Sequence, residues 1–351
     1  MTNGGLRPLA QSFYTREESR RKMAAGQLTM RIVSLLPAAT EILYALGAGH
    51  CVVGVTHECD FPAEAASKPA VIRPRVDPSA PQAELDRQVR ELVERGESIY
   101  AVDADLLEKL SPDLIVTQDL CHVCAASPED LAASLARMPQ AARPRVVTFT
   151  PRTLDDVWQG IRLIGEAAGY KPEGDRLAAS LAMRVAEIAA RVADVPWRPR
   201  VLALEWFDPP FFAGHWVPEM VRLAGGNDVL GREGEPSVTV AWQRILTQQP
   251  EIIVLMPCGY GLARNIEVWN STHLPEGWDQ LPAVQAGQVY AVDANGYFSR
   301  SGPRLADGVA LLARLFHPEQ FAQEIASGLG VDSAWPVQRI GAAPSFIRPT
   351  A

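Results

Sequence analysis

The sequence has little lysine, few cysteines and no long apolar run, and each shortage excludes a class of protein. Only four of its 33 basic residues are lysines, and 41 acidic residues give the 351-residue chain a net charge of −8. A nucleic-acid partner is therefore not expected. Five cysteines are too few, and odd in number, for a disulfide scaffold. No stretch of about 20 uncharged apolar residues is present, so we expect no membrane span.

The first 30 residues contain charged clusters and no apolar segment of secretory length. A secretory signal needs about 7–15 apolar residues after a basic start. We therefore expect a cytoplasmic location, with a periplasmic or other extracytoplasmic location as the alternative.

Strand and helix patterns alternate along most of the chain. Short β-rich runs occupy residues 31–36, 51–55, 114–117, 145–149, 201–204, 252–256 and 289–292. Helical spacing of apolar residues occupies 38–46, 82–95, 103–110, 128–136, 217–223, 240–247 and 305–316. Strands separated by helices indicate parallel βαβ units. The sequence therefore predicts an α/β fold with mainly parallel sheets, and its length fits two domains of about 150 residues each.

One helix pattern, at residues 174–194, is longer than the others. It has no proline or glycine inside it, and Leu177, Leu181, Val185 and Ile188 recur at helical spacing. At 1.5 Å per residue it would extend for roughly 30 Å, about one domain diameter. The pattern alone fits both a rigid connector between two lobes and an ordinary surface helix.

Residue types that carry chemistry gather in the loops after the predicted strands, where open α/β sheets bind ligands. Four of the five cysteines lie in these loops, and Cys51, at the start of a strand, is expected to be a small buried hydrophobe. The candidate residues are His57, Glu58, Cys59, Cys121, His122, Cys124, Glu205, Trp206, His215, Trp216, Cys258, Tyr260, Tyr297 and Arg304.

The cysteines suggest a metal site. Cys121 and Cys124 form a C-x₂-C element, and Cys59 and Cys258 would complete a four-thiolate set if their loops converge. Such a set suits zinc or an iron–sulfur cluster, with His57 or His122 as substitutes. The alternatives are a thiol exchange site and reduced thiols that line a ligand cleft.

The aromatic residues suggest a different use of the same loops. Trp206, Trp216, Tyr260 and Tyr297 could wall a flat ligand or simply pack in the core. Arg304, near a predicted helix start, could hold an anionic group or lie solvated. Glu205 has no partner carboxylate or base in its motif, and the common nucleotide-binding and hydrolase motifs are missing, so no enzymatic activity is indicated.

The order of these segments resembles a known family. The run RIVSLLPAATEILYALGAG from Arg31, followed by VVGVT, DFP and, later, LSPDLIV, is similar to vitamin B12-binding proteins of ABC importers. The resemblance covers roughly residues 31–320. It implies two α/β lobes joined by one long rigid helix, and a ligand held between the lobes without catalysis. The usual ligands are cobalamins, heme, siderophores or metal ions.

The resemblance also implies a domain division. The N-terminal lobe would cover residues 31–152, the helical connecting segment 153–195 and the C-terminal lobe 196–325, with an extension at 1–30 and a tail at 326–351. Members dock on a permease through an acidic residue on each lobe. Asp105 stands at the first place, but Asn227 stands at the second, beside Asp228. The sequence therefore gives permease docking weak support, and we expect a monomer.

Two hypotheses follow. In the first, the protein binds cobalamin or another corrinoid in its cleft, with Trp206, Trp216 and Tyr297 against the ligand and Arg304 on an anionic substituent. In the second, Cys59, Cys121, Cys124 and Cys258 hold zinc or an iron–sulfur cluster, and the protein is a cytoplasmic metalloprotein with a potential catalytic role.

Overall fold

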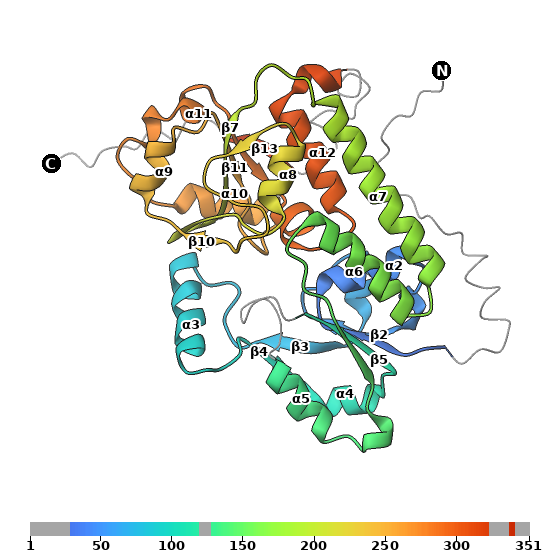
Figure 1. Ribbon diagram of the computed structural model, residues 1–351. Coiled ribbons are helices and arrows are strands. Elements are labelled where there is room, and N and C mark those ends of the chain that lie inside the picture. The colour runs from blue at the N-terminus through green and yellow to red at the C-terminus, as the bar shows by residue number, and fades with distance from the viewer. Residues whose placement is uncertain (1–28, 119–127, 323–336, 341–351) are drawn as a thin grey trace, which may run out of the picture.

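The computed structural model describes residues 29–118, 128–322 and 337–340. Their helices and strands form two α/β lobes, each built on a central sheet, with a pair of helices running between them (Figure 1). The α/β fold with two lobes, predicted from strand–helix alternation, is confirmed.

The N-terminal lobe is a six-stranded sheet in the order β4-β3-β2-β1-β5-β6. Its strands are β1 (Ile32–Ser34), β2 (Val52–Thr56), β3 (Ala70–Pro74), β4 (Tyr100–Val102), β5 (Leu114–Thr117) and β6 (Arg145–Thr148). All neighbours pair parallel except β3 and β4, which are antiparallel. The strand order reverses between β1 and β5, which is where an α/β sheet offers a ligand crevice.

Both faces of this sheet are buried. Ile32 and Val52 belong to one apolar cluster together with α2 (Pro37–Ala45). Val33 and Ile115 point to the other face, where Leu107 of α4 (Ala104–Leu110) and Leu131 of α5 (Pro128–Ala136) cover them. Adjacent strand residues face opposite sides, so the continuous apolar strands in the sequence are those of a sheet covered by helices on both sides.

The C-terminal lobe is a seven-stranded sheet in the order β10-β8-β7-β11-β12-β13, with β9 also paired to β7. Its strands are β7 (Arg200–Phe207), β8 (Pro210–Phe212), β9 (Asn227–Asp228), β10 (Val238–Thr239), β11 (Ile252–Leu255), β12 (Val289–Val292) and β13 (Val337–Ile340). Strands β7, β9, β11 and β12 run parallel, while β8 pairs antiparallel with β7, β10 with β8 and β13 with β12. Strand β13 comes from the segment that the sequence assigned to the tail.

The helices of the C-terminal lobe include α8 (Val217–Leu223), α9 (Trp242–Gln248), α10 (Leu262–Ser271), α11 (Pro282–Gln285) and α12 (Leu305–Phe316). Helix α12 is buried along its whole length. The sequence predicted α8 and α12 with these same bounds and missed α10.

Two helices connect the lobes. Helix α6 (Leu154–Ala167) packs on α2 of the N-terminal lobe, and α7 (Lys171–Arg191) packs on α8 and α12 of the C-terminal lobe. Figure 1 shows α7 extending alongside both lobes. The two helices meet at glycines, because a Cβ on Gly165 would lie 3.0 Å from the Cα of Gly174. An ion pair of 2.6 Å between Arg184 and Asp307 fastens α7 to α12.

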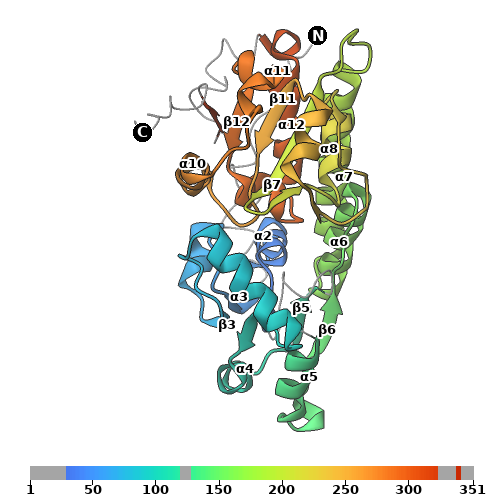
Figure 2. The ribbon, with the colours of Figure 1, turned by 90° about the vertical axis from the view of Figure 1, so that its left-hand side faces the viewer.

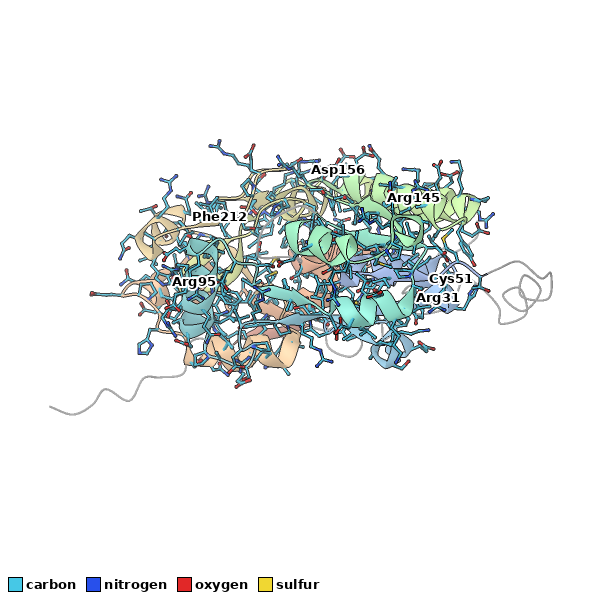
Figure 3. The ribbon with its side chains drawn as sticks, turned by 90° about the horizontal axis from the view of Figure 1, so that it is seen from below. Arg31, Cys51, Arg95, Arg145, Asp156 and Phe212 are labelled. Atoms are coloured by element: carbon cyan, nitrogen blue, oxygen red, sulfur yellow. The ribbon has the colours of Figure 1, made fainter. Side chains whose placement is uncertain are left out.

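Helix α3 (Gln82–Glu94) leaves the N-terminal lobe and lies beneath the C-terminal lobe. It connects the antiparallel strands β3 and β4, so it projects from the edge of the sheet. Figure 2 shows it across the front of the N-terminal lobe, below α10. In Figure 3, Arg95, just after α3, lies on the same side of the molecule as Phe212 of β8, while Arg31 and Cys51 lie at the opposite side.

Candidate functional site

A cavity of about 1230 Å³ lies between the two lobes. Drug-sized ligands occupy pockets of roughly 300–1,000 Å³, so this cavity can accept a larger molecule. Its walls come from the loops after β1, β2 and β5 of one sheet and after β7, β11 and β12 of the other. The carboxyl ends of the parallel strands in both lobes therefore face the same space, as expected of an α/β ligand site.

The N-terminal wall combines an apolar helix face with a polar loop. Leu85, Val89 and Val93, at every fourth position of α3, turn one side of this helix to the cavity. Val93 remains 44% exposed, so part of this apolar helix face is open to the cavity. His57 and Glu58, in the loop after β2, line the same space.

The C-terminal wall is aromatic. Trp206 and Tyr260 contact each other with their ring centres 5.4 Å apart, and both line the cavity. Trp216 lines it too, and its indole Nε1 donates a hydrogen bond of 2.8 Å to the carbonyl of Phe298. That bond satisfies the polar end of a buried indole and holds the ring in place. The wall is therefore preformed.

Glu205 and His215 are the polar groups on this aromatic wall. The Oε2 atom of Glu205 accepts a hydrogen bond of 2.7 Å from the Ser237 hydroxyl. Burial raises the pKa of the Glu205 carboxyl above its ordinary value, against the opposing effect of that bond. Burial, aided by the charge of Arg152, lowers the pKa of His215, so the imidazole is neutral at pH 7.

His57, on the opposite wall, has a defined tautomer. Its Nδ1 lies 3.2 Å from the carbonyl oxygen of Ile72, which can only accept, so Nδ1 carries the proton. The Nε2 atom lies 3.9 Å from a carboxylate oxygen of Glu58. The ring also packs against Tyr100, with centres 5.8 Å apart.

A buried ion network joins the two lobes beside the cavity. Glu41 of α2 accepts hydrogen bonds of 2.9 and 2.6 Å from Arg304 and one of 3.1 Å from Arg300. Arg300 also contacts Asp60 at 2.5 Å and donates to the Glu58 carbonyl at 2.8 Å. The Glu41 side chain is only 2% exposed. We call Glu41, Asp60, Arg300 and Arg304 the interlobe ion network.

The structure brings most of the predicted ligand residues together. Those that line the cavity are His57, Glu58, Glu205, Trp206, His215, Trp216 and Tyr260, and the predicted metal ligand Cys258 lines it as well. Tyr297 and Arg304 are not among the lining residues. Arg304 lies 4.2 Å from the centre of the Phe61 ring and serves Glu41, so its placement does not support the expected contact with an anionic ligand group.

The proposed four-cysteine site is not assembled in the part of the chain that the structure describes. Cys59 is buried 3.1 Å from the Thr40 hydroxyl and 3.3 Å from that of Thr56, and burial raises the pKa of its thiol. No group of three or more potential ligands was found among the described residues. Cys121, His122 and Cys124 lie outside the described residues, so the zinc or cluster site stays a prediction.

Sequence reasoning missed two parts of the site. It did not place α3 at the cavity, although the spacing of Leu85, Val89 and Val93 marked an apolar face. It did not pair Glu41 with arginines more than 250 positions away. A carboxylate inside the apolar helix Pro37–Ala45 was the available signal, because buried charges in proteins are paired.

The two expected docking acids differ in exposure. Asp105 is 82% exposed at the start of α4, where it pairs with Arg137. On the other lobe Asn227 is exposed, whereas the carboxylate of Asp228 accepts bonds from the backbone N–H groups of Leu230 and Gly231. The inward carboxylate of Asp228 cannot replace an exposed acid at this place. Among the described helices, none is both long and apolar enough to cross a bilayer.

Comparisons with known proteins agree with the fold. A Bacillus subtilis protein named as an uncharacterized ABC transporter substrate-binding lipoprotein, YvrC, is 24% identical over 298 residues, covering 84% of this chain and 82% of its own. The vitamin B12-binding protein of Vibrio cholerae is 24% identical over 283 residues, covering 80% of this chain and 86% of its own.

Solved structures show the same arrangement. The periplasmic heme-binding protein RhuT of Roseiflexus sp. RS-1 matches with a TM-score of 0.62 and 26% identity, over 84% of this chain and all of that one. The vitamin B12-binding protein BtuF of Vibrio cholerae matches with a TM-score of 0.58 and 22% identity, over 83% of this chain and 97% of that one. Relatives named as lipoprotein or periplasmic support the extracytoplasmic alternative over the predicted cytoplasmic location.

A family model described as "Periplasmic binding protein" matches residues 32–295, which include both sheets' parallel strands and the two connecting helices. These relatives are named as substrate-binding or vitamin B12-binding proteins. The resemblance noted in the sequence is thus confirmed, and the chain belongs to the periplasmic binding protein family.

Proposed function

We propose that this protein binds a corrinoid, a cobalamin-type metal macrocycle, in the cavity between its lobes. The size of the cavity and its aromatic wall suit a flat molecule larger than a typical drug. Relatives named as vitamin B12-binding and heme-binding proteins support a metal macrocycle as the ligand. At the edge of the ring, corrinoids such as cobalamin carry carboxamides, whereas heme carries two carboxylates.

The choice between a corrinoid and heme depends on the charged side chains that line the cavity. Each of the three arginines that line the described part of the cavity already has a carboxylate partner. Arg90 pairs with Asp86, Arg264 pairs with Glu267 at 2.9 Å, and Arg300 belongs to the interlobe ion network.

Carboxyl groups, in contrast, remain available on the cavity wall. Glu94 and Glu205 line the cavity, and neither forms an ion pair among the described residues. Two heme carboxylates would thus meet an excess of like charge and would have to displace existing ion pairs. Neutral carboxamides meet neither obstacle, so the cavity favours a corrinoid.

Calorimetric titration of the full chain tests this function. Cobalamin is expected to bind once per chain with micromolar or tighter affinity, and heme at least tenfold more weakly. Trp206→Ala removes aromatic surface from the wall and is expected to weaken cobalamin binding about tenfold or more. Trp197→Ala is the matched control, because Trp197 is 49% exposed and does not line the cavity. Heme binding tighter than cobalamin would overturn the proposal.

A location outside the cytoplasm is the second part of the proposal. We propose that the chain works outside the cytoplasm, since its relatives are named as lipoprotein or periplasmic proteins. Of the two places where docking acids are expected, only the first carries an exposed acidic residue, Asp105, whereas the carboxylate of Asp228 points inward. Cell fractionation tests the location, and recovery of the native protein with cytoplasmic markers would refute it.

A further inference from the structure

One corner of the cavity combines three unusual backbone features. Glu205 lies at an irregularity in the pairing of β7 with β8, where Leu204 pairs with Phe212 and Trp206 with Phe211. Glu205 is therefore the extra residue of a β-bulge. Bulges turn a side chain away from its regular direction and are common beside functional sites. Here the bulged side chain lines the cavity.

The second and third features are neighbours in the sequence. A Cβ on Gly214 would lie 2.4 Å from the backbone nitrogen of Ser237, so only glycine fits there. His215 follows with φ of 53°, in the left-handed region that a residue with a side chain adopts at a cost. The backbone N–H of His215 donates to the backbone carbonyl of Glu235 at 2.5 Å, and its carbonyl accepts from the backbone N–H of Gly234 at 2.9 Å. These two bonds hold the conformation.

These features form one connected unit. The Ser237 hydroxyl donates to the Glu205 carboxylate at 2.7 Å and accepts from the Gly214 N–H at 3.2 Å. We call Glu205, Gly214, His215 and Ser237 the Glu205 subsite. Backbone strain of this kind persists where the surrounding structure enforces it, and it gathers at ligand sites.

The subsite leaves hydrogen-bonding capacity for a ligand. Among the described residues, Glu205 accepts from Ser237 and has no cationic partner. The imidazole of His215 packs against Trp216 with ring centres 5.7 Å apart, and its ring nitrogens have no hydrogen bond within the described part of the chain. A neutral imidazole supplies one donor and one acceptor. A ligand group with both capacities would satisfy the two side chains.

We propose that the Glu205 subsite recognises a neutral carboxamide arm of the bound ligand and selects against a carboxylate at that place. A carboxamide offers N–H groups to the Glu205 oxygens and a carbonyl to the His215 N–H. A carboxylate has no donor for the Glu205 oxygens, and the ionised form of Glu205 would repel it. This inference rests on the proposed corrinoid function and assigns the residues that contact the side chains at the edge of the corrin ring.

The test compares two corrinoids that differ in these arms. Dicyanocobinamide carries carboxamides, and dicyanocobyrinic acid carries carboxylates in their place. Calorimetry at pH 7.5 is expected to show at least tenfold tighter binding of the amide form by the wild-type chain, the difference that one well-placed hydrogen bond to a charged group provides. Glu205→Gln supplies a donor and removes the charge, so it is expected to reduce this ratio to threefold or less.

Two further variants complete the design. Glu187→Gln removes the same charge from the exposed side of α7, away from the cavity, and is expected to leave the ratio within twofold of the wild-type value. His215→Gly removes the imidazole and suits the left-handed backbone, so a folded variant is expected, with binding of the amide form weakened about fivefold.

Three results would overturn the inference. They are an unchanged ratio in Glu205→Gln, an equal effect in Glu187→Gln, and unchanged binding of the amide form by His215→Gly. Wild-type binding of both corrinoids without preference would remove this inference and leave the proposed function intact. Failure to bind either corrinoid would remove both.

Discussion

Glu41→Gln should destabilise the protein more than most single substitutions, because it removes the charge shared by two buried arginines. Glu41 accepts three N–H bonds, of 2.9, 2.6 and 3.1 Å, from Arg304 and Arg300. The two arginine side chains are only 15% and 6% exposed, so water cannot replace the lost carboxylate. Leaving a buried charge without its partner costs about 3–5 kcal/mol. Arg300 keeps Asp60, so we expect a loss of about 3 kcal/mol.

Urea unfolding followed by circular dichroism measures this loss. Asp60→Asn is the matched control in the same network, because the Asp60 side chain is 61% exposed. An exposed ion pair contributes about 0–1 kcal/mol, so the control should lose less than about 1 kcal/mol. A Glu41→Gln variant no less stable than Asp60→Asn would show that the network does not hold the lobes together.

Two further predictions concern stability. Burial raises the pKa of Asp228 from 3.8 to about 6, so the folded chain binds a proton that the unfolded chain has lost between these values. The stability from Asp228 is greatest below about pH 4 and is lost as the pH rises through 6. Between pH 4 and 7.5 wild type should lose about 2 kcal/mol relative to Asp228→Asn in urea unfolding; a constant difference would contradict this. Gly165→Ala should lower the free energy of unfolding by about 1–3 kcal/mol, because the added methyl group crowds Gly174. Gly261→Ala is the control, because open space surrounds its Cβ, and it should lose less than about 1 kcal/mol. Equal melting temperatures of the two variants would contradict the close helix contact.

Local patterns were enough to predict the two-lobed α/β plan. Strands such as Leu114–Thr117 and Val289–Val292 are short apolar runs between turns, and α12 (Leu305–Phe316) has apolar residues on every face. These signals depend only on neighbours in the sequence. The connecting helix begins and ends three residues earlier than its pattern predicted, at Lys171 and Arg191. It can begin before Pro172 because proline is tolerated in the first turn of a helix.

The parts that could not be predicted depend on distant contacts. Strands β8, β9 and β10 have two or three residues each, too few for a periodic pattern, and they exist because they pair with β7 or with each other. Arg304 looked like a ligand contact because it follows a strand-end loop, but it donates hydrogen bonds to Glu41 of the other lobe. The bulge at Glu205 likewise arises from pairing with β8.

The location of a bound corrinoid tests the central claim most directly. Diffraction from crystals of the chain with cobalamin, measured at the cobalt absorption edge, reveals the metal as an anomalous peak. The account predicts one peak per chain inside the cavity, between α3 of the N-terminal lobe and Trp206 of the C-terminal lobe. A peak on the outer surface, or crystals grown with excess cobalamin that show no peak at all, would contradict it.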